Sequence, residues 1–230
     1  MSIKIIGAGF PRTGTLTLKN ALETLGYKKT YHYVDLIANS KKLKYWKELE
    51  NKGHTDFETL FNGFEATVDF PGYPYYKILL KKYPEAKVIL TKRDFDLWYE
   101  STYKTIWKSA NKPITERLNL LKRKLLNKNL RAIFKCVKFM RRVYLLGQFD
   151  NQFNNKEQAK KVYFKHIKEV VGHVPEKQLL IYDVAQGWEP LCQFLELPIP
   201  PQEFPHLNKR ENFHNMVKKM IAKASKNAIE

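Results

Sequence analysis

The sequence predicts an α/β fold with a parallel central sheet covered by helices on both faces, in three layers. Short apolar segments alternate with longer stretches in which apolar residues recur at helical spacing. The first apolar segment leads into a glycine-containing loop and then into a helical pattern, which is the order strand, tight turn, helix. A length of 230 residues, with 43% hydrophobic and 28% charged residues, fits one domain over residues 1–230 with a sizeable core.

Strands are expected where short β-branched or apolar runs are bounded by polar residues, at Ile3–Gly7, Ala66–Asp69, Lys87–Thr91 and Gln178–Tyr182. Apolar residues at helical spacing predict helices over Thr15–Leu25, Leu43–Asn51, Tyr75–Tyr83, Phe95–Lys108, Glu116–Leu146, Lys156–Val171 and Trp188–Leu195. Asp94 is expected to cap the fourth of these helices, and Pro84 and Pro198 follow the ends of the third and the last. The tail from Met216 has the pattern of a basic amphipathic helix.

The loop between the first strand and the first helix has the composition of an anion-binding site, where backbone N–H groups and the positive end of the helix dipole converge. Gly9 and Gly14 have the spacing found in the P-loop of nucleoside triphosphatases. However, Thr15 stands where that loop carries lysine, and Leu16 stands where it carries the hydroxyl that holds magnesium. The cation is Arg12, inside the loop. These residues predict a P-loop-type fold and a phosphate-type donor that is handled without the usual metal.

The net charge of +18 predicts attraction to anions but does not choose among nucleotides, nucleic acid, acidic polymers and a membrane surface. Much of the positive charge lies in a basic amphipathic helix expected over residues 117–142. That helix is either a solvated face of a basic protein or a contact surface for an acidic substrate or an anionic lipid.

The sequence also bears on compartment and redox chemistry. No apolar stretch approaches the roughly 20 residues of a membrane span, and the N-terminus has no secretory signal, so the expected location is the cytoplasm. The two cysteines, Cys136 and Cys192, lie among apolar residues and are expected in the core.

Three groups of polar residues are expected to meet at one edge of the sheet, because ligands of parallel sheets bind at the carboxyl ends of the strands. They are the glycine-containing loop, Asp69 at the end of the second expected strand, and Arg93 after the third. Ser101 follows Arg93 by eight residues, about two turns into the next helix. An arginine at a strand end and a hydroxyl on the following helix can hold one phosphate from two sides.

The chain resembles the sulfotransferase superfamily, whose members take a sulfuryl group from 3′-phosphoadenosine 5′-phosphosulfate (PAPS). Within it, the chain is similar to the small sulfotransferase-like proteins with a Pro-Arg-Thr-Gly-Thr loop. The resemblance rests on that loop, on Arg93 with Ser101, and on C-terminal segments between Ile181 and Asn208. It implies a donor site without a metal, made by Arg12, Thr13, Gly14, Thr15, Leu16, Thr17, Arg93 and Ser101.

The resemblance also implies catalytic roles. Arg12 would stabilise the charge on the leaving phosphate, aided by the N–H groups and threonine hydroxyls of the loop. A hydroxyl or amine acceptor then needs a base, and Asp69 is the first candidate because it ends a strand beside the loop. The alternative roles for Asp69 are a helix cap or an ion pair with Arg12. His32 is the rival base.

The sequence leaves the acceptor and two other functions open. Aromatic residues in 31–34 and 70–76 favour a flat or apolar small-molecule acceptor, whereas the basic helix favours an acidic one. A small-molecule kinase would need the lysine and the magnesium ligand that the loop lacks. A non-catalytic protein that binds anions or nucleic acid would explain the net charge, but no recognised nucleic-acid motif is present.

Overall fold

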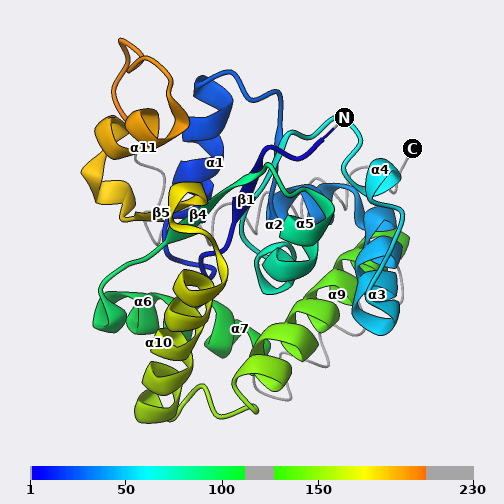
Figure 1. The fold of residues 1–230 in the computed structure, drawn as a ribbon. Helices are drawn as coiled ribbons and strands as arrows, with labels where there is room; N and C mark the ends of the chain where they lie inside the picture. Colours follow the sequence, from blue (N-terminus) through cyan, green and yellow to red (C-terminus); the bar gives the residue numbers. More distant parts are fainter. Residues whose placement is uncertain (1, 112–126, 206–230) are drawn as a thin grey trace.

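A five-stranded parallel sheet runs through the middle of the computed structural model, which describes residues 2–111 and 127–205 (Figure 1). The strands are β1 Ile5–Gly7, β2 Thr30–Tyr31, β3 Ala66–Thr67, β4 Lys87–Thr91 and β5 Leu179–Tyr182. They lie in the order β2-β3-β1-β4-β5, and every neighbouring pair is parallel. In the central strand, Ile5 lies opposite Ala66 of β3 and Lys87 of β4.

Helices flank the sheet. Their bounds are α1 Thr15–Thr24, α2 Tyr33–Ala38, α3 Leu43–Lys52, α4 Phe57–Leu60, α5 Tyr76–Lys82, α6 Phe95–Thr102, α7 Lys108–Ala110, α9 Lys128–Met140, α10 Lys156–His173 and α11 Trp188–Leu195. Two π-helical segments, Tyr103–Trp107 and Arg141–Gln148, join α6 to α7 and extend α9.

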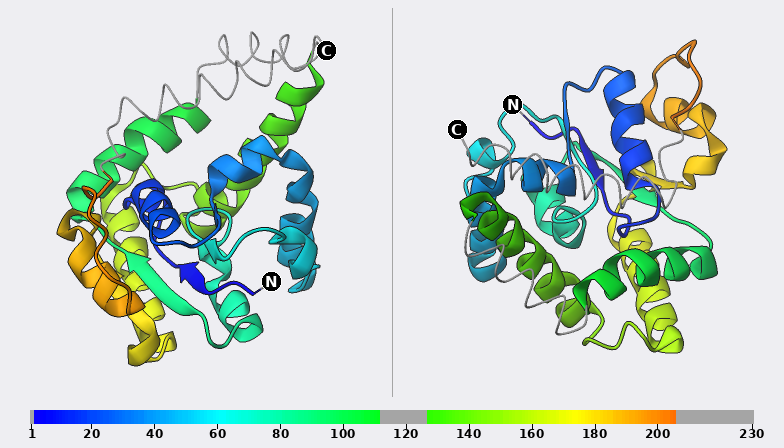
Figure 2. Two further views of the ribbon diagram at one scale, coloured as in Figure 1. Left: turned by 90° about the horizontal axis from the view of Figure 1, so that it is seen from above. Right: turned by 180° about the vertical axis from the view of Figure 1, so that it is seen from behind.

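Each face of the sheet is buried under its own helices, because successive strand residues point to opposite sides (Figure 2). Ile5 and Ile89 belong to a core shared with α1 and α11. Ile6, Val88 and Leu90 belong to a larger core on the other face, shared with α5, α6, α9 and α10. The predicted α/β class, with helices on both faces of a parallel sheet, is confirmed.

β4 has the predicted bounds, whereas β1, β3 and β5 are shorter than the sequence predicts. β1 begins at Ile5 rather than Ile3, and β5 begins at Leu179 rather than Gln178. The prediction of a strand over Ala66–Asp69 is wrong at its end, because β3 stops at Thr67 and Asp69 has a φ of 64°. A positive φ takes the backbone out of the extended region, so it turns the chain away from the sheet immediately after the strand.

The predicted helix over Glu116–Leu146 is wrong as one continuous helix. Asn127 is extended, with φ −134° and ψ 112°, and its side chain accepts hydrogen bonds from the N–H groups of Asn129 and Leu130. Asparagine favours this capping position, so α9 begins at Lys128. Residues 117–126, the first part of the expected basic helix over 117–142, lie outside the described residues, as does the tail from Met216.

Several other predictions are confirmed. Asp94 caps α6 by accepting from the N–H of Leu97, as expected, and α11 has the predicted bounds. Cys136 and Cys192 are both buried, one in each core. The short helices α2 and α4 were not predicted.

In the part of the chain that the structure describes, no helix combines the length and apolar character needed to cross a bilayer.

The loop after β1 passes very close to β4. A Cβ atom placed on Gly9 would lie 2.0 Å from Oγ1 of Thr91 and 2.5 Å from its carbonyl oxygen. Only glycine permits this approach, because a backbone carbonyl in a central strand cannot move aside without breaking the sheet. The loop is therefore fixed against the strand that leads to Arg93.

We expect Gly9→Ala to lower the free energy of unfolding by at least about 3 kcal/mol, because the added methyl overlaps backbone atoms. Gly172→Ala is the matched control, since Gly172 lies near the end of α10 with open space around it. There the same change should raise stability by up to about 1 kcal/mol. Urea unfolding of both variants measures the difference, and similar effects at the two positions would show that the contact with β4 is not tight.

Candidate active site

Two side chains from distant helices hold the loop that follows β1. The ring centre of buried Phe10 lies 4.5 Å from that of His166 in α10 and 5.5 Å from that of Trp98 in α6. His166 Nε2–H donates to the carbonyl oxygen of Ala8 at 2.7 Å, and Trp98 Nε1–H donates to that of Pro11 at 3.0 Å. Burial lowers the pKa of His166, which keeps it a neutral donor. The backbone on both sides of Phe10 is therefore fixed.

Thr13 shapes the loop from within. Its hydroxyl donates to the carbonyl oxygen of Phe10 at 2.6 Å, and its backbone N–H donates to the same oxygen at 3.3 Å. The hydroxyl also lies 2.6 Å from the hydroxyl of Thr91 in β4. Thr13 is one of the residues predicted to contact the donor. Its hydroxyl is already hydrogen-bonded within the protein, to the Phe10 carbonyl and the Thr91 hydroxyl.

The N-terminus of α1 is open to an anion. Gly14, at the N-cap, has a φ of 102°, and no side chain caps the helix within the described residues. The first turn carries no acidic residue. Arg12, two residues earlier, also has a left-handed backbone, with a φ of 73°. A helix end of this kind, with glycine at its N-cap and an arginine beside it, suits a phosphate or sulfate group.

Asp69 lies buried beside this helix end, with 5% of its surface exposed. Its Oδ1 accepts a hydrogen bond from the hydroxyl of Thr15 at 3.0 Å. Burial raises the pKa of Asp69 to about 7, although the Thr15 hydroxyl and the positive charge of Arg12 oppose the rise. A carboxyl group with that pKa exchanges a proton near neutral pH.

His32 joins the same cluster from the start of α2. Its Nδ1 accepts from the backbone N–H of Val34 at 3.2 Å, so the side chain caps α2 and the ring proton lies on Nε2. Nε2 lies 3.3 Å from the Thr15 hydroxyl and 3.5 Å from Oδ2 of Asp69. Burial lowers the pKa of His32 to about 3, assisted by the positive charges of Lys19 and Arg12. His32 is therefore neutral, with its Nε2–H facing the Thr15 hydroxyl, which in turn donates to Asp69.

A cavity of about 70 Å³ opens beside these groups. Its walls are formed by Pro11, Arg12, Thr15, Leu16, His32, Tyr33, Val34, Asp69, Phe70, Ile106 and Met140. The residues come from the loop, from the start of α1, from α2 and its N-cap, from the turn after β3 and from the two helices that carry π-helical segments. The described residues contain no group of three or more His, Cys, Asp and Glu side chains placed to hold a metal ion.

The structure gives Arg93 and Ser101, the predicted phosphate-binding pair, separate contacts within the protein. The buried hydroxyl of Ser101 accepts a hydrogen bond from Nε of Arg12 at 3.2 Å. Arg93 is half-buried, and the contacts of its backbone are with the hydroxyl of Tyr163. Thr17, in the first turn of α1, is buried. The structure thus brings Arg12, Thr15, Asp69, His32 and Ser101 into one region.

The sequence alone does not identify several residues of this region as parts of the site. Ile106 and Met140 lie far along the chain from the loop, inside apolar patterns that are typical of core residues. Trp98 and His166 also reach the loop across large sequence separations. His32 was recognised only as a rival to Asp69, whereas the two side chains are neighbours.

Two comparisons relate the sequence of this chain to known proteins. A family model of the sulfotransferase domain matches residues 4–213 of the chain. A protein of Aspergillus versicolor described as Ava biosynthesis cluster protein M is 30% identical over 221 residues, a region that covers 89% of this chain and 80% of that protein.

The capping role of His32 can be separated from its contact with Asp69. Asparagine at position 32 can still accept from the N–H of Val34, but it lacks the Nε2–H that faces the carboxylate. We expect His32→Ala to destabilise the protein by about 1 kcal/mol more than His32→Asn does, because only alanine removes the cap. Urea unfolding of both variants measures this, and equal losses would mean that the Val34 contact adds nothing to stability.

Proposed function

The chain belongs to the sulfotransferase domain family, and from that membership we propose that it transfers a sulfuryl group from PAPS to a hydroxyl or amine acceptor. The observation that carries the proposal is the clustering of Arg12, Thr15, His32 and Asp69 around one cavity at the N-terminus of α1. This cluster combines an anion site with a buried acid–base group, as group transfer requires. The extent of the family match supports treating residues 1–230 as a single domain.

The donor side of the proposal rests on the helix end and on Arg12. The 5′-phosphosulfate lies against the first N–H groups of α1, with Gly14, Thr15, Leu16 and Thr17 around it. The N-cap residue Gly14 has no side chain to bond these N–H groups, and the first turn carries no carboxylate. The 3′-phosphate of the same donor binds between Arg93 and Ser101.

The acceptor side rests on Asp69. The acceptor oxygen attacks sulfur, and its proton passes to the Asp69 carboxylate. The bond between sulfur and the bridging oxygen of the 5′-phosphate breaks, and that oxygen leaves with the electron pair on adenosine 3′,5′-bisphosphate. Arg12 stabilises the charge that develops on the leaving oxygen. Protein groups thus act at both ends of the transferred group.

Asp69 is a better base than His32 in this arrangement. The Nδ1 lone pair of His32 is used by the backbone of Val34, and Nε2 carries a proton. Its lowered pKa keeps the ring from taking up a second proton. His32 instead orients Asp69 and, together with the Thr15 hydroxyl, supports its ionised form.

We expect adenosine 3′,5′-bisphosphate to bind without added divalent metal, and more tightly than adenosine 5′-monophosphate. Arg93→Ala should weaken bisphosphate binding by about 10- to 100-fold, as for loss of one charge-assisted hydrogen bond, and should barely affect the monophosphate. Lys92→Ala, at the neighbouring exposed position, is the control. Calorimetric titration measures all of these constants. Equal losses for both nucleotides would make Arg93 structural, and tighter binding of ATP with magnesium than of the bisphosphate would contradict the proposed donor.

We expect kcat/KM to rise about tenfold per pH unit up to about pH 7 and then to level off, because the base form of Asp69 appears as its proton is lost. Asp69→Asn should lower turnover by roughly 10²–10⁴-fold and remove this pH dependence. Asp96→Asn, at an exposed position of α6, is the control. Bisphosphate affinity, measured in parallel, should stay constant; a rate loss matched by lost donor binding would instead make Asp69 a partner of Arg12.

A further inference from the structure

Arg93 lies at the point where the chain leaves β4. Successive residues of a strand direct their backbone groups to alternate sides. The carbonyl of Ile89 accepts from the N–H of Ala8, beside β1, at 2.9 Å, whereas the N–H of Lys92 donates to Tyr182 of β5 at 2.8 Å. By the same alternation Arg93 faces the β1 side, where the chain has already left the sheet to form the loop that follows β1. The N–H and carbonyl groups of Arg93 therefore need partners from outside the sheet.

The hydroxyl of Tyr163, on α10, supplies both partners. It donates to the carbonyl oxygen of Arg93 at 2.7 Å and accepts from the N–H of the same residue at 3.1 Å. Burial raises the pKa of Tyr163, so the hydroxyl keeps the proton that it donates. This one side chain thus gives Arg93 the two hydrogen bonds that a neighbouring strand gives to the residues before it.

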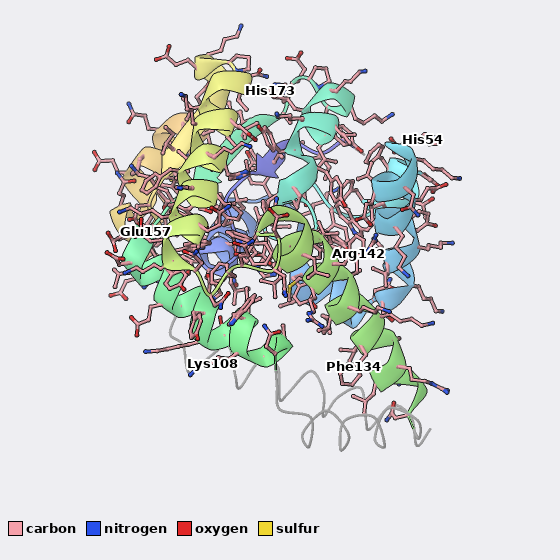
Figure 3. The ribbon with its side chains drawn as sticks, turned by 90° about the horizontal axis from the view of Figure 1, so that it is seen from below. His54, Lys108, Phe134, Arg142, Glu157 and His173 are labelled. Atoms are coloured by element: carbon pink, nitrogen blue, oxygen red, sulfur yellow. The ribbon has the colours of Figure 1, made fainter. Side chains whose placement is uncertain are left out.

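Close packing holds the Tyr163 ring against both the loop and α6. Glu157 and His173 lie toward the two ends of α10, and the end at Glu157 lies beside α6 (Figure 3). The ring centre of Tyr163 lies 4.4 Å from that of Trp98, on α6, and 5.8 Å from that of Phe10, in the loop. The hydroxyl that binds Arg93 is therefore fixed relative to the loop that faces the 5′-phosphosulfate.

The neighbours of Arg93 in the chain are fixed by other means. Lys92 is bonded to β5, and Asp94 caps α6 by accepting from the N–H of Leu97 at 3.0 Å. Arg93 is the one residue between the sheet and the cap, and rotation of its peptide groups would redirect its side chain. The two bonds from Tyr163 prevent that rotation.

We propose that Tyr163 is a positioning residue of the donor site, which fixes the backbone of Arg93 so that the guanidinium group meets the 3′-phosphate without reordering of the main chain. This inference rests on the proposed transfer from PAPS, because that proposal puts the 3′-phosphate at Arg93. Tyr163 acts through Arg93 and does not itself bind the donor. A cation on an ordered backbone loses less conformational freedom when it binds, so its affinity for the phosphate is higher.

The first test is Tyr163→Phe, which keeps the ring and removes the hydroxyl. Calorimetric titration gives the preference for adenosine 3′,5′-bisphosphate over adenosine 5′-monophosphate. We expect this preference to fall about tenfold, because only the bisphosphate uses Arg93. Tyr99→Phe is the matched control, since the Tyr99 hydroxyl donates to the backbone carbonyl of Asn154 at 3.1 Å, and the preference should not change there. Equal losses for both nucleotides in Tyr163→Phe would make the hydroxyl purely structural and would overturn the inference.

A double variant tests whether Tyr163 acts through Arg93. In the Arg93→Ala background the guanidinium group is gone, so adding Tyr163→Phe should weaken bisphosphate binding by less than about twofold. A further loss of about tenfold in that background would mean that Tyr163 affects the donor by another route, and it would contradict the inference.

Hydrogen exchange at the Arg93 amide tests the same inference in the unaltered protein, so the answer does not depend on the folding of a variant. This N–H, which donates to Tyr163, should already be protected in the free protein. The bisphosphate should slow its exchange by no more than about threefold. Slowing by about tenfold or more would show that the ligand orders the Arg93 backbone, and it would overturn the inference.

The outcome is separable from the proposed function. If the unaltered protein binds the bisphosphate and the monophosphate equally, the proposed donor is wrong and the role of Tyr163 fails with it. If the unaltered protein prefers the bisphosphate and Tyr163→Phe keeps that preference, the role of Tyr163 is wrong and the proposed donor still stands.

Discussion

The burial of the Asp69 carboxylate against the N-terminus of α1 is the constraint on which the site depends. A buried carboxylate without partners is costly, and this one is supported by the Thr15 hydroxyl, the neighbouring His32 and the charge of Arg12. These partners offset only part of the cost of burial, which leaves the pKa near 7. The same residues also line the cavity. The contacts that stabilise the buried carboxylate are therefore the contacts that form the site.

Arg12 links the helix end that suits an anion to the buried carboxylate. Its guanidinium group donates to Ser101 on α6, while its charge acts on both Asp69 and His32. One cation therefore lies between the helix end that suits an anion and the carboxylate that suits a proton. Its left-handed backbone conformation belongs to the same tight loop that Gly14 completes before α1 begins. The backbone conformation of the loop therefore also sets where the Arg12 charge lies relative to Asp69 and His32.

The sequence revealed the parts of the site that lie near strand ends. The glycine spacing located the loop, and the carboxyl-end rule brought Asp69 to it. Local patterns could not reveal β2, which has only two residues, or the N-cap of α9 at Asn127. They also could not pair His32 with Asp69, because a histidine that caps a short helix has no periodic signature. Ile106 and Met140 became cavity residues only through packing of distant helices.

The contacts of the loop backbone have a consequence for how its motif should be understood. The carbonyl of Ala8 is bound by His166, which is 158 positions away, and that of Pro11 is bound by Trp98, which is 87 positions away. The short run of residues from Gly9 to Thr15 is therefore not a portable module that would keep its shape when grafted elsewhere. Its conformation is a property of most of the chain, so a similar run in an unrelated protein would carry little information about function unless equivalent donors were present there.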